Sequence, residues 1–338
     1  MDADTKFDGH SSGTTPRIAL IGAPSSAGAH TLGLEKAPAA LRSAGLVKEL
    51  EQTGLPVVDF GDLPVVRFRV DPEHPRGQSA GDVARVAGMV AEAVATALAA
   101  GNLPLVIGGD CTITLGVVSG FLRQEIDPAL FYIDGGLDIG TPQTYAPGRL
   151  DSMGMAHLVD EPGAIDALAS IGPRRPLLRG SQIVPYGYKH GVPQEPEDEF
   201  LRRHEIAGYA IDEIDADFPG TLETAARRLD QLGRPFVIHF DVDVHDFVDF
   251  PVADVPEYNS GLTFEQSMTV LGRSVQLPSF AALVVTEFNP DHAGEDGALA
   301  RKLVRGLASV MSRAARIAPP SSGIEAETYA SVETIRRG

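Results

Sequence analysis

Short apolar runs alternate with longer amphipathic stretches along most of the chain. The apolar runs are rich in Val, Ile, Leu and Phe and end in Gly or Asp, which is typical of buried strands. We expect seven strands, at residues 17–22, 57–61, 104–109, 129–134, 182–186, 236–241 and 281–287. Helical periodicity predicts helices near 36–51, 79–100, 113–124, 151–159, 163–171, 220–232, 263–275 and 297–315. This alternation predicts a three-layer α/β fold with a mostly parallel central sheet.

The two ends of the chain depart from this pattern. Residues 1–16 are small, polar and interrupted by Gly and Pro, so we expect a disordered leader, and residues 319–338 predict a similar C-terminal tail. Between them we find no internal repeat and no long linker, and we expect a single domain over residues 17–318. No apolar run reaches the roughly 18 residues that a membrane span needs.

Composition narrows the class of protein. The chain has 338 residues, of which 43% are hydrophobic, so it can build a large core. The single cysteine excludes an intramolecular disulfide, and the N-terminus lacks the features of a signal peptide, so we expect a cytoplasmic protein. The net charge of −18 argues against nucleic acid and membrane surfaces as partners. A negative charge of this size would favour a small cationic substrate. Surplus acidic residues can also do no more than keep the protein soluble.

Carboxylates directly follow several of the predicted strands. Asp241 and Asp243 stand two apart, so along an extended strand both project to the same side. Two buried carboxylates aimed at one point repel each other unless a cation lies between them. For this pair alone, a strand that ends in two solvent-exposed acids is an equally good interpretation. However, further possible metal ligands follow the other predicted strands. They are the thiol of Cys111 and the carboxylates of Asp134, Asp138 and Glu287. Because parallel sheets bind ligands beyond the carboxyl ends of their strands, we expect a divalent metal site there.

These residues lie in motifs that resemble those of the ureohydrolase (arginase/agmatinase) family, in the same order from residue 21 to residue 290. The matching segments are Ile21-Gly-Ala-Pro-Ser-Ser-Ala-Gly28, Gly108-Gly-Asp-Cys111, Asp134-Gly-Gly-Leu-Asp138, His239-Phe-Asp-Val-Asp243, Gly261-Leu-Thr263 and Glu287-Phe-Asn-Pro290. The resemblance implies the arginase-like fold, a homo-oligomer, and a pair of Mn²⁺ ions whose bridging hydroxide attacks a guanidinium carbon.

Carried over by position, the resemblance implies a set of metal ligands. Asp134 and Asp241 would bridge both ions, Cys111 and Asp138 would complete the first site, and Asp243 would serve the second. Asp138 would also hold the hydroxide. The ions would acidify and orient the water.

The resemblance also implies substrate contacts. Glu287 would pair with the cationic nitrogens of the substrate, and Thr263 would contribute to substrate binding. Asp151 stands near the place of a proton-shuttling histidine and would act catalytically if burial raised its pKa; the alternative, which we favour, is a helix N-cap. Arg149 would hold an anionic group of the substrate, and free arginine is a doubtful substrate.

Two metal-binding histidines of the family are replaced in this chain. Cys111 stands at one position, either as a thiolate ligand that favours Zn²⁺ or Fe²⁺ over Mn²⁺ or as a small buried hydrophobe. Gly136 stands at the other and offers no ligand. We therefore expect one tight divalent metal, Mn²⁺ first and Zn²⁺ or Fe²⁺ as alternatives, and a weak or absent second site. We expect His239 to pack behind the aspartates; whether it, His245 or His157 replaces a lost ligand stays open.

Two functions therefore stay open. One is a metal-dependent hydrolase that cleaves a C–N bond in a guanidino, hydroxyguanidino or amidino compound. The other is a protein of the same fold with a depleted metal site, acting as a scaffold or regulator or catalysing another reaction. Retention of the acidic positions favours the first, because clustered buried charge without a metal is unfavourable.

Overall fold

A single parallel sheet forms the centre of the molecule. The computed structural model describes residues 17–256, 258–294 and 296–314, so the predicted leader and tail lie outside the described residues. The strand order is β2-β1-β3-β7-β6-β4-β5, and every neighbouring pair is parallel. The bounds are β1 Arg17–Ala23, β2 Val57–Asp62, β3 Asn102–Gly108, β4 Ala129–Ile133, β5 Ile183–Tyr186, β6 Phe236–Asp241 and β7 Phe280–Thr286. All seven strands agree with the sequence prediction to within two residues.

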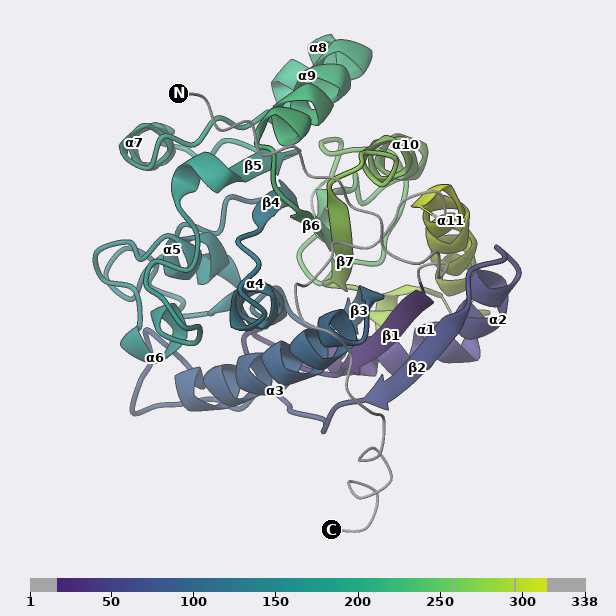
Figure 1. The fold of residues 1–338 in the computed structure, drawn as a ribbon. Helices are drawn as coiled ribbons and strands as arrows, with labels where there is room; N and C mark the ends of the chain where they lie inside the picture. The colour runs from purple at the N-terminus through teal and green to yellow at the C-terminus, as the bar shows by residue number, and fades with distance from the viewer. Residues whose placement is uncertain (1–16, 257, 295, 315–338) are drawn as a thin grey trace, which may run out of the picture.

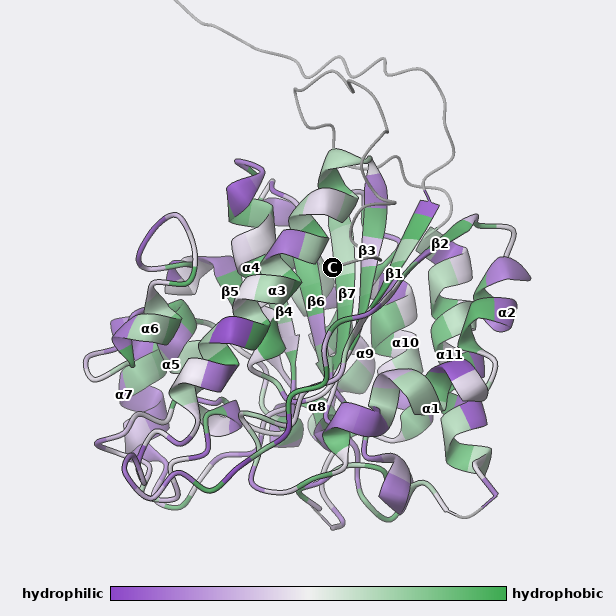
Figure 2. Cartoon of the chain, turned by 90° about the horizontal axis from the view of Figure 1, so that it is seen from below, coloured by the Kyte–Doolittle hydropathy of each residue, from purple (hydrophilic) through white to green (hydrophobic). Residues whose placement is uncertain are grey.

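Helices cover both faces of the sheet, which confirms the three-layer α/β architecture (Figures 1 and 2). One face packs against α3 (Ala80–Ala99), α4 (Ile113–Arg123), α5 (Gly154–Leu158) and α6 (Asp166–Ala169). The other packs against α1 (Ala37–Ser43), α2 (Leu46–Glu51), α9 (Phe218–Gln231), α10 (Phe264–Ser274) and α11 (Ala298–Ala314). The four strands β3, β7, β6 and β4 are buried along their whole length, as expected for parallel strands covered on both sides.

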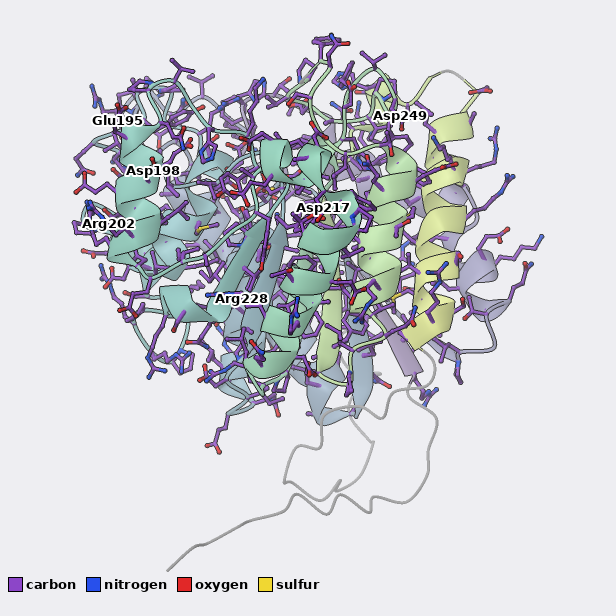
Figure 3. The ribbon with its side chains drawn as sticks, turned by 90° about the horizontal axis from the view of Figure 1, so that it is seen from above. Glu195, Asp198, Arg202, Asp217, Arg228 and Asp249 are labelled. Carbon is purple, nitrogen blue, oxygen red and sulfur yellow. The ribbon has the colours of Figure 1, made fainter. Side chains whose placement is uncertain are left out.

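Each predicted helical region contains a helix, but some are shorter than expected. The stretch 36–51 divides into α1 and α2 because Gly45 between them adopts a left-handed conformation. Two helices were missed, α7 (Glu195–Arg203) and α8 (Ile211–Ala216). Helix α7 buries only Phe200, so its sequence carries little apolar periodicity. Figure 3 shows Glu195, Asp198 and Arg202 of α7 on the outside of the molecule.

The sheet order decides which loops meet. Strands β3, β7, β6 and β4 are consecutive neighbours although they come from distant parts of the chain. Their carboxyl ends therefore share one edge, where the segments that follow them lie side by side. Among the described residues, no helix has the length and apolar character needed to cross a membrane.

Candidate functional site

The loop after β3 places Cys111 at the carboxyl edge of the sheet. Gly109 passes so close to β1 that a Cβ there would lie 1.8 Å from the Ser25 carbonyl oxygen, so only glycine fits. Asp110 turns away from the edge and accepts hydrogen bonds from the Ser25 hydroxyl and the Gly28 amide. The Cys111 side chain is buried and lies between β6 and β7 residues, with Sγ 3.4 Å from Thr286 Oγ1.

The segment after β4 bends sharply. Asp134 is buried, and its Oδ1 accepts a hydrogen bond of 2.6 Å from the amide of Gly136. Asp138 has a positive φ of 49° and accepts a hydrogen bond of 2.5 Å from the hydroxyl of Tyr132. Asp134 and Asp138 therefore do not lie in one extended segment. The bend nevertheless brings both carboxylates toward position 136, where a Cβ would lie 3.5 Å from Asp134 Oδ1 and 3.6 Å from Asp138 Oδ1.

Strand β6 ends at Asp241, as its predicted bounds had it, so Asp243 lies beyond the strand. The chain then turns into a 3₁₀ helix, η4 (Val242–Val244), whose N-terminus Asp241 caps by accepting from the Asp243 amide at 2.7 Å. Asp243 is thus not a strand residue, which corrects the expected geometry. Its Oδ1 accepts a hydrogen bond of 3.0 Å from the Gly135 amide, so it still faces the segment after β4.

Four side chains converge on one point at this edge. Cys111, Asp134, His239 and Asp241 are all buried, and each offers a ligand atom within 4.8 Å of the other three. Cys111 Sγ lies 2.5 Å from Asp241 Oδ2, and His239 Nε2 lies 3.3 Å from Asp134 Oδ2. The expectation that His239 packs behind the aspartates is wrong, because its ring nitrogen faces them directly.

Glu287 closes the site from the end of β7. It is buried, adopts a positive φ of 62°, and accepts a hydrogen bond of 3.0 Å from the Cys111 amide. A left-handed glutamate costs about 1 kcal/mol or more, a strain that is often found at functional sites. Its carboxylate therefore lies next to the Cys111 loop, as the predicted substrate contact requires.

The site is electrostatically unfavourable without a cation. Burial, reinforced by repulsion among the carboxylates, raises the pKa of Asp134, Asp138, Asp241 and Glu287 well above the usual range. Burial also raises the pKa of the Cys111 thiol, and Asp241 adds to this effect. At Asp138 the nearby Arg149 guanidinium opposes this rise in pKa. A divalent cation fits this donor set, because it would supply the missing positive charge.

The remaining predicted site residues occupy different environments. Asp151 is buried in the 3₁₀ helix η2 (Asp151–Met153), where its Oδ1 accepts from the amide and hydroxyl of Ser152. No side chain caps α5, so the N-cap interpretation is wrong. Burial raises the pKa of Asp151 to about 7. The Arg149 guanidinium is half-buried and donates to the Tyr145 hydroxyl at 2.9 Å. Thr263 is exposed and caps α10, so its substrate contact stays a prediction.

Two of the three candidate histidines are engaged elsewhere. His245 uses Nδ1 at 2.7 Å from the Val242 carbonyl and Nε2 at 2.7 Å from the Ser267 hydroxyl. His157 hydrogen-bonds to the Met153 carbonyl through Nδ1, and its side chain is buried on α5. Burial lowers the pKa of both rings to about 4. Both histidines are therefore packing residues, and His239 alone joins the cluster.

Two residues beside the cluster were missed. Tyr132 stacks on the His239 ring and donates to Asp138; strand alternation places it on the same face as Asp134, a signal that was available. Thr114, in the first turn of α4, lies 2.7 Å from His239 Nδ1. Its amide donates to the Cys111 carbonyl at 3.1 Å, so the turn that leads into α4 places it beside Cys111.

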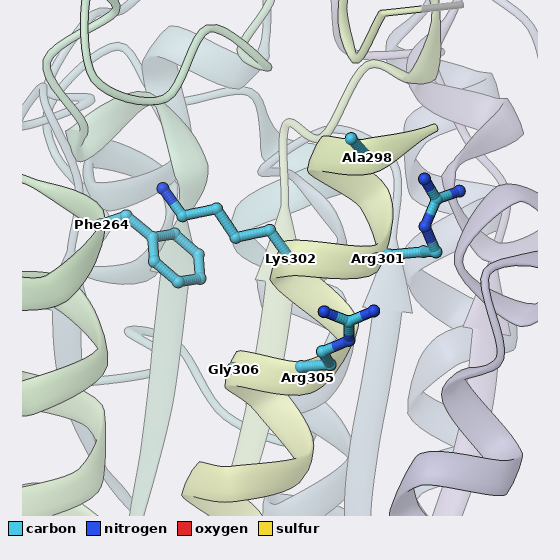
Figure 4. Close-up of a pocket in the computed structure, with 6 residues that line it drawn as sticks. All are labelled: Phe264, Ala298, Arg301, Lys302, Arg305 and Gly306. Carbon is cyan, nitrogen blue, oxygen red and sulfur yellow. The ribbon is translucent and has the colours of Figure 1, made fainter. Parts of the chain in front are cut away.

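A separate pocket lies on the surface between α10 and α11. It is lined by Phe264, Ala298, Arg301, Lys302, Arg305 and Gly306. Figure 4 shows Lys302 reaching from α11 toward Phe264, and its Nζ lies 4.4 Å from the ring centroid. None of the predicted site residues lines this pocket, so it is distinct from the cluster.

Comparisons with known proteins agree with this fold. The model of the Arginase family matches residues 16–310. Arginase, non-hepatic 1, from Xenopus laevis is 30% identical over 285 residues, which is 81% of this chain and 76% of that protein. The structure of arginase from Bacillus caldovelox aligns with a TM-score of 0.77 at 24% identity, covering 88% of this chain and 98% of that one. Proclavaminate amidino hydrolase from Streptomyces clavuligerus aligns with a TM-score of 0.67 at 20% identity, covering 89% and 92%.

Proposed function

Because this chain belongs to the arginase family, we propose that it hydrolyses a C–N bond of a linear guanidino or amidino compound with water activated by a divalent metal. Members of that family are hydrolases of such bonds. The observation that carries the proposal is the convergence of Cys111, Asp134, His239 and Asp241, with further carboxylates beside them, at one edge of the sheet. A buried cluster of this kind has a physical use only when a cation joins it.

The metal would be held chiefly by Cys111, Asp134 and Asp241, with Asp138 and Asp243 nearby. Bound there, a divalent ion supplies an acidified, oriented water molecule. The many carboxylate oxygens favour Mn²⁺, and a Cys111 thiolate would shift the preference toward Zn²⁺ or Fe²⁺. Gly136 contributes no ligand, so we expect one tight metal in each subunit and a weak or absent second site.

The surrounding residues have distinct tasks in this proposal. Asp138, fixed by Tyr132, orients the attacking water through its free oxygen. Glu287 pairs with the cationic nitrogens of the substrate, and burial makes that pairing stronger than it would be in water. Asp151 carries a proton toward the leaving amine, a task for which a pKa near 7 is suited. Arg149 binds an anionic group at the other end of the substrate.

The net charge and the site together define the partners that we propose. An acidic protein with a buried acidic site suits a small cationic substrate rather than nucleic acid or a membrane surface. Assembly into a homo-oligomer and a cytoplasmic location remain predictions from the sequence.

One experiment separates this function from the alternative of a metal-depleted scaffold or regulator, which the Gly136 position favours. The purified protein is dialysed exhaustively, its metal content is measured, and hydrolysis is then assayed after loading with Mn²⁺, Zn²⁺ or Fe²⁺, by urea release for a panel of guanidino compounds and by release of the amine or ammonia for amidino compounds. Asp241→Asn is the matched control. Metal retention with hydrolysis that depends on Asp241 supports the proposal. A protein that retains no metal and hydrolyses none of the compounds is the scaffold instead.

A further inference from the structure

His239 is held in one orientation at the centre of the molecule. It is fully buried in β6, and its ring stacks on that of Tyr132, its register partner on β4, with centroids 4.2 Å apart and planes 7° from parallel. Its Nδ1 lies 2.7 Å from Thr114 Oγ1 on α4. The stacking fixes the plane of the ring, and the hydrogen bond fixes its rotation.

This orientation directs Nε2 into the cluster. Nε2 faces Asp134 Oδ2 at 3.3 Å and Cys111 Sγ at 3.7 Å. When Nδ1–H donates to the Thr114 hydroxyl, the lone pair of Nε2 points at both. A neutral imidazole oriented by a partner on its other nitrogen is the usual arrangement of a metal-binding histidine.

We propose that His239 replaces a lost imidazole of the metal site, binding the ion through Nε2 together with Cys111, Asp134 and Asp241. The inference rests on the metal-dependent function proposed above. Ligands about 2.0–2.3 Å from a tetrahedral ion lie roughly 3.3–3.8 Å from one another. The distances from His239 Nε2 to Asp134 and to Cys111 match such edges. The contact of 2.5 Å between Cys111 Sγ and Asp241 Oδ2 is shorter than such an edge, so these two side chains would have to move apart to share an ion.

This ligand set has consequences for the metal. The imidazole of His239 comes from within strand β6, two residues before Asp241. The histidine that the family resemblance implies would instead stand at position 111, in the loop after β3. The resulting donors are one nitrogen, one sulfur and two oxygens, a set that favours Zn²⁺ or Fe²⁺ more than an all-oxygen site does. Thr114 is then a positioning residue that acts through His239, and it does not touch the metal.

X-ray absorption of the full-length protein loaded with one equivalent of Zn²⁺ tests the assignment, because an imidazole ring gives a scattering pattern that carboxylate and sulfur ligands do not. The wild-type protein is expected to show one sulfur and one imidazole. His239→Ser is expected to lose the imidazole, keep the sulfur and bind Zn²⁺ more weakly. His157→Gln, which changes a buried histidine outside the cluster, is the matched control and is expected to leave the spectrum unchanged.

A second variant keeps the inference falsifiable if His239→Ser fails to fold. Thr114→Val retains the imidazole and is expected to weaken Zn²⁺ binding about 10–100-fold, the usual effect of losing an outer partner; unchanged affinity would contradict the positioning role. Zn²⁺ bound without imidazole, or an imidazole signal that persists in His239→Ser, overturns the ligand assignment alone. A wild-type protein that binds no metal at all instead refutes the proposed metal-dependent function.

Discussion

Gly136→His is expected to create a second metal site. Residue 136 lies in the bend between Asp134 and Asp138, and a Cβ built there meets their Oδ1 atoms at 3.5 Å and 3.6 Å, which are ordinary contacts. The φ of Gly136 is not in the left-handed region, so a side chain introduces no backbone strain. The imidazole would therefore enter beside two carboxylates without displacing them, and it adds a ligand without adding negative charge.

The size of the effect can be worked from linkage. Replacing a glycine in a conformation open to other residues stabilises a protein by about 0.4–1 kcal/mol, so the metal-free variant is expected to melt no lower than the wild type. With free Mn²⁺ at about 100 times the new dissociation constant, binding adds about 2.7 kcal/mol. In a domain of this size that is roughly 5 °C in melting temperature.

Calorimetric titration with Mn²⁺ and melting curves measure both effects. Gly136→Ala is the matched control, because it changes the backbone in the same way and supplies no ligand. Gly135→His tests position, since a Cβ there would lie 2.9 Å from the Asp243 carbonyl oxygen and fit poorly. If Gly136→His folds but still binds a single Mn²⁺, the reasoning about a depleted second site is wrong, and the hydrolase proposal weakens with it.

Four further predictions follow from the same geometry. Elemental analysis after dialysis is expected to find about one tight divalent metal per subunit; two equivalents of Mn²⁺, or none, would contradict this. Asp241→Asn is expected to abolish metal binding and, in chelator, to melt higher than the wild type because it relieves carboxylate repulsion; unchanged melting in both conditions would refute its role. The pH profile of hydrolysis is expected to show an inflection near 7 that Asp151→Asn removes, since the pKa of Asp151 is raised to about 7. The pKa of His245 falls from 6.5 to about 4 on folding, so its contribution to stability is lost as pH falls through that window; His245→Gln is expected to remove about 3 kcal/mol of this dependence in denaturant titrations at pH 7 and pH 4.

Most of the fold was predictable because buried parallel strands and amphipathic helices leave strong patterns. Strands β4 and β6 are continuous apolar runs that end in aspartate, so their bounds were clear. Helix α7 was not predictable in the same way, because a helix with one buried side chain is stabilised by charge and turn signals rather than by an apolar face. The elements that build the core were therefore easier to predict from the sequence than peripheral helices such as α7.

Part of the cluster was predictable from the sequence, but its geometry was not. Residues at strand ends pointed to Cys111, Asp134 and Asp241, because topology alone brings those ends together. Alternation failed at Asp243, where the chain had left the sheet, since loop dihedrals are set by tertiary contacts. The position of His239 needed the structure, because its orientation depends on Tyr132 and Thr114, which come from two other elements.

The place of β7 in the sheet also constrains how the chain is made. Strand β7 is the last strand in sequence, yet it lies between β3 and β6. Without Phe280–Thr286, the sets β2-β1-β3 and β6-β4-β5 have no strand between them, and β3 and β6 would each be an unpaired edge of the kind that is prone to aggregate. Insertion of β7 pairs both edges in one step and brings Cys111 from one half to Asp134 and Asp241 from the other. The cluster of Cys111, Asp134, His239 and Asp241 therefore cannot be complete before β7 is made, and a nascent chain cut short before residue 280 lacks the strand that joins the two sets.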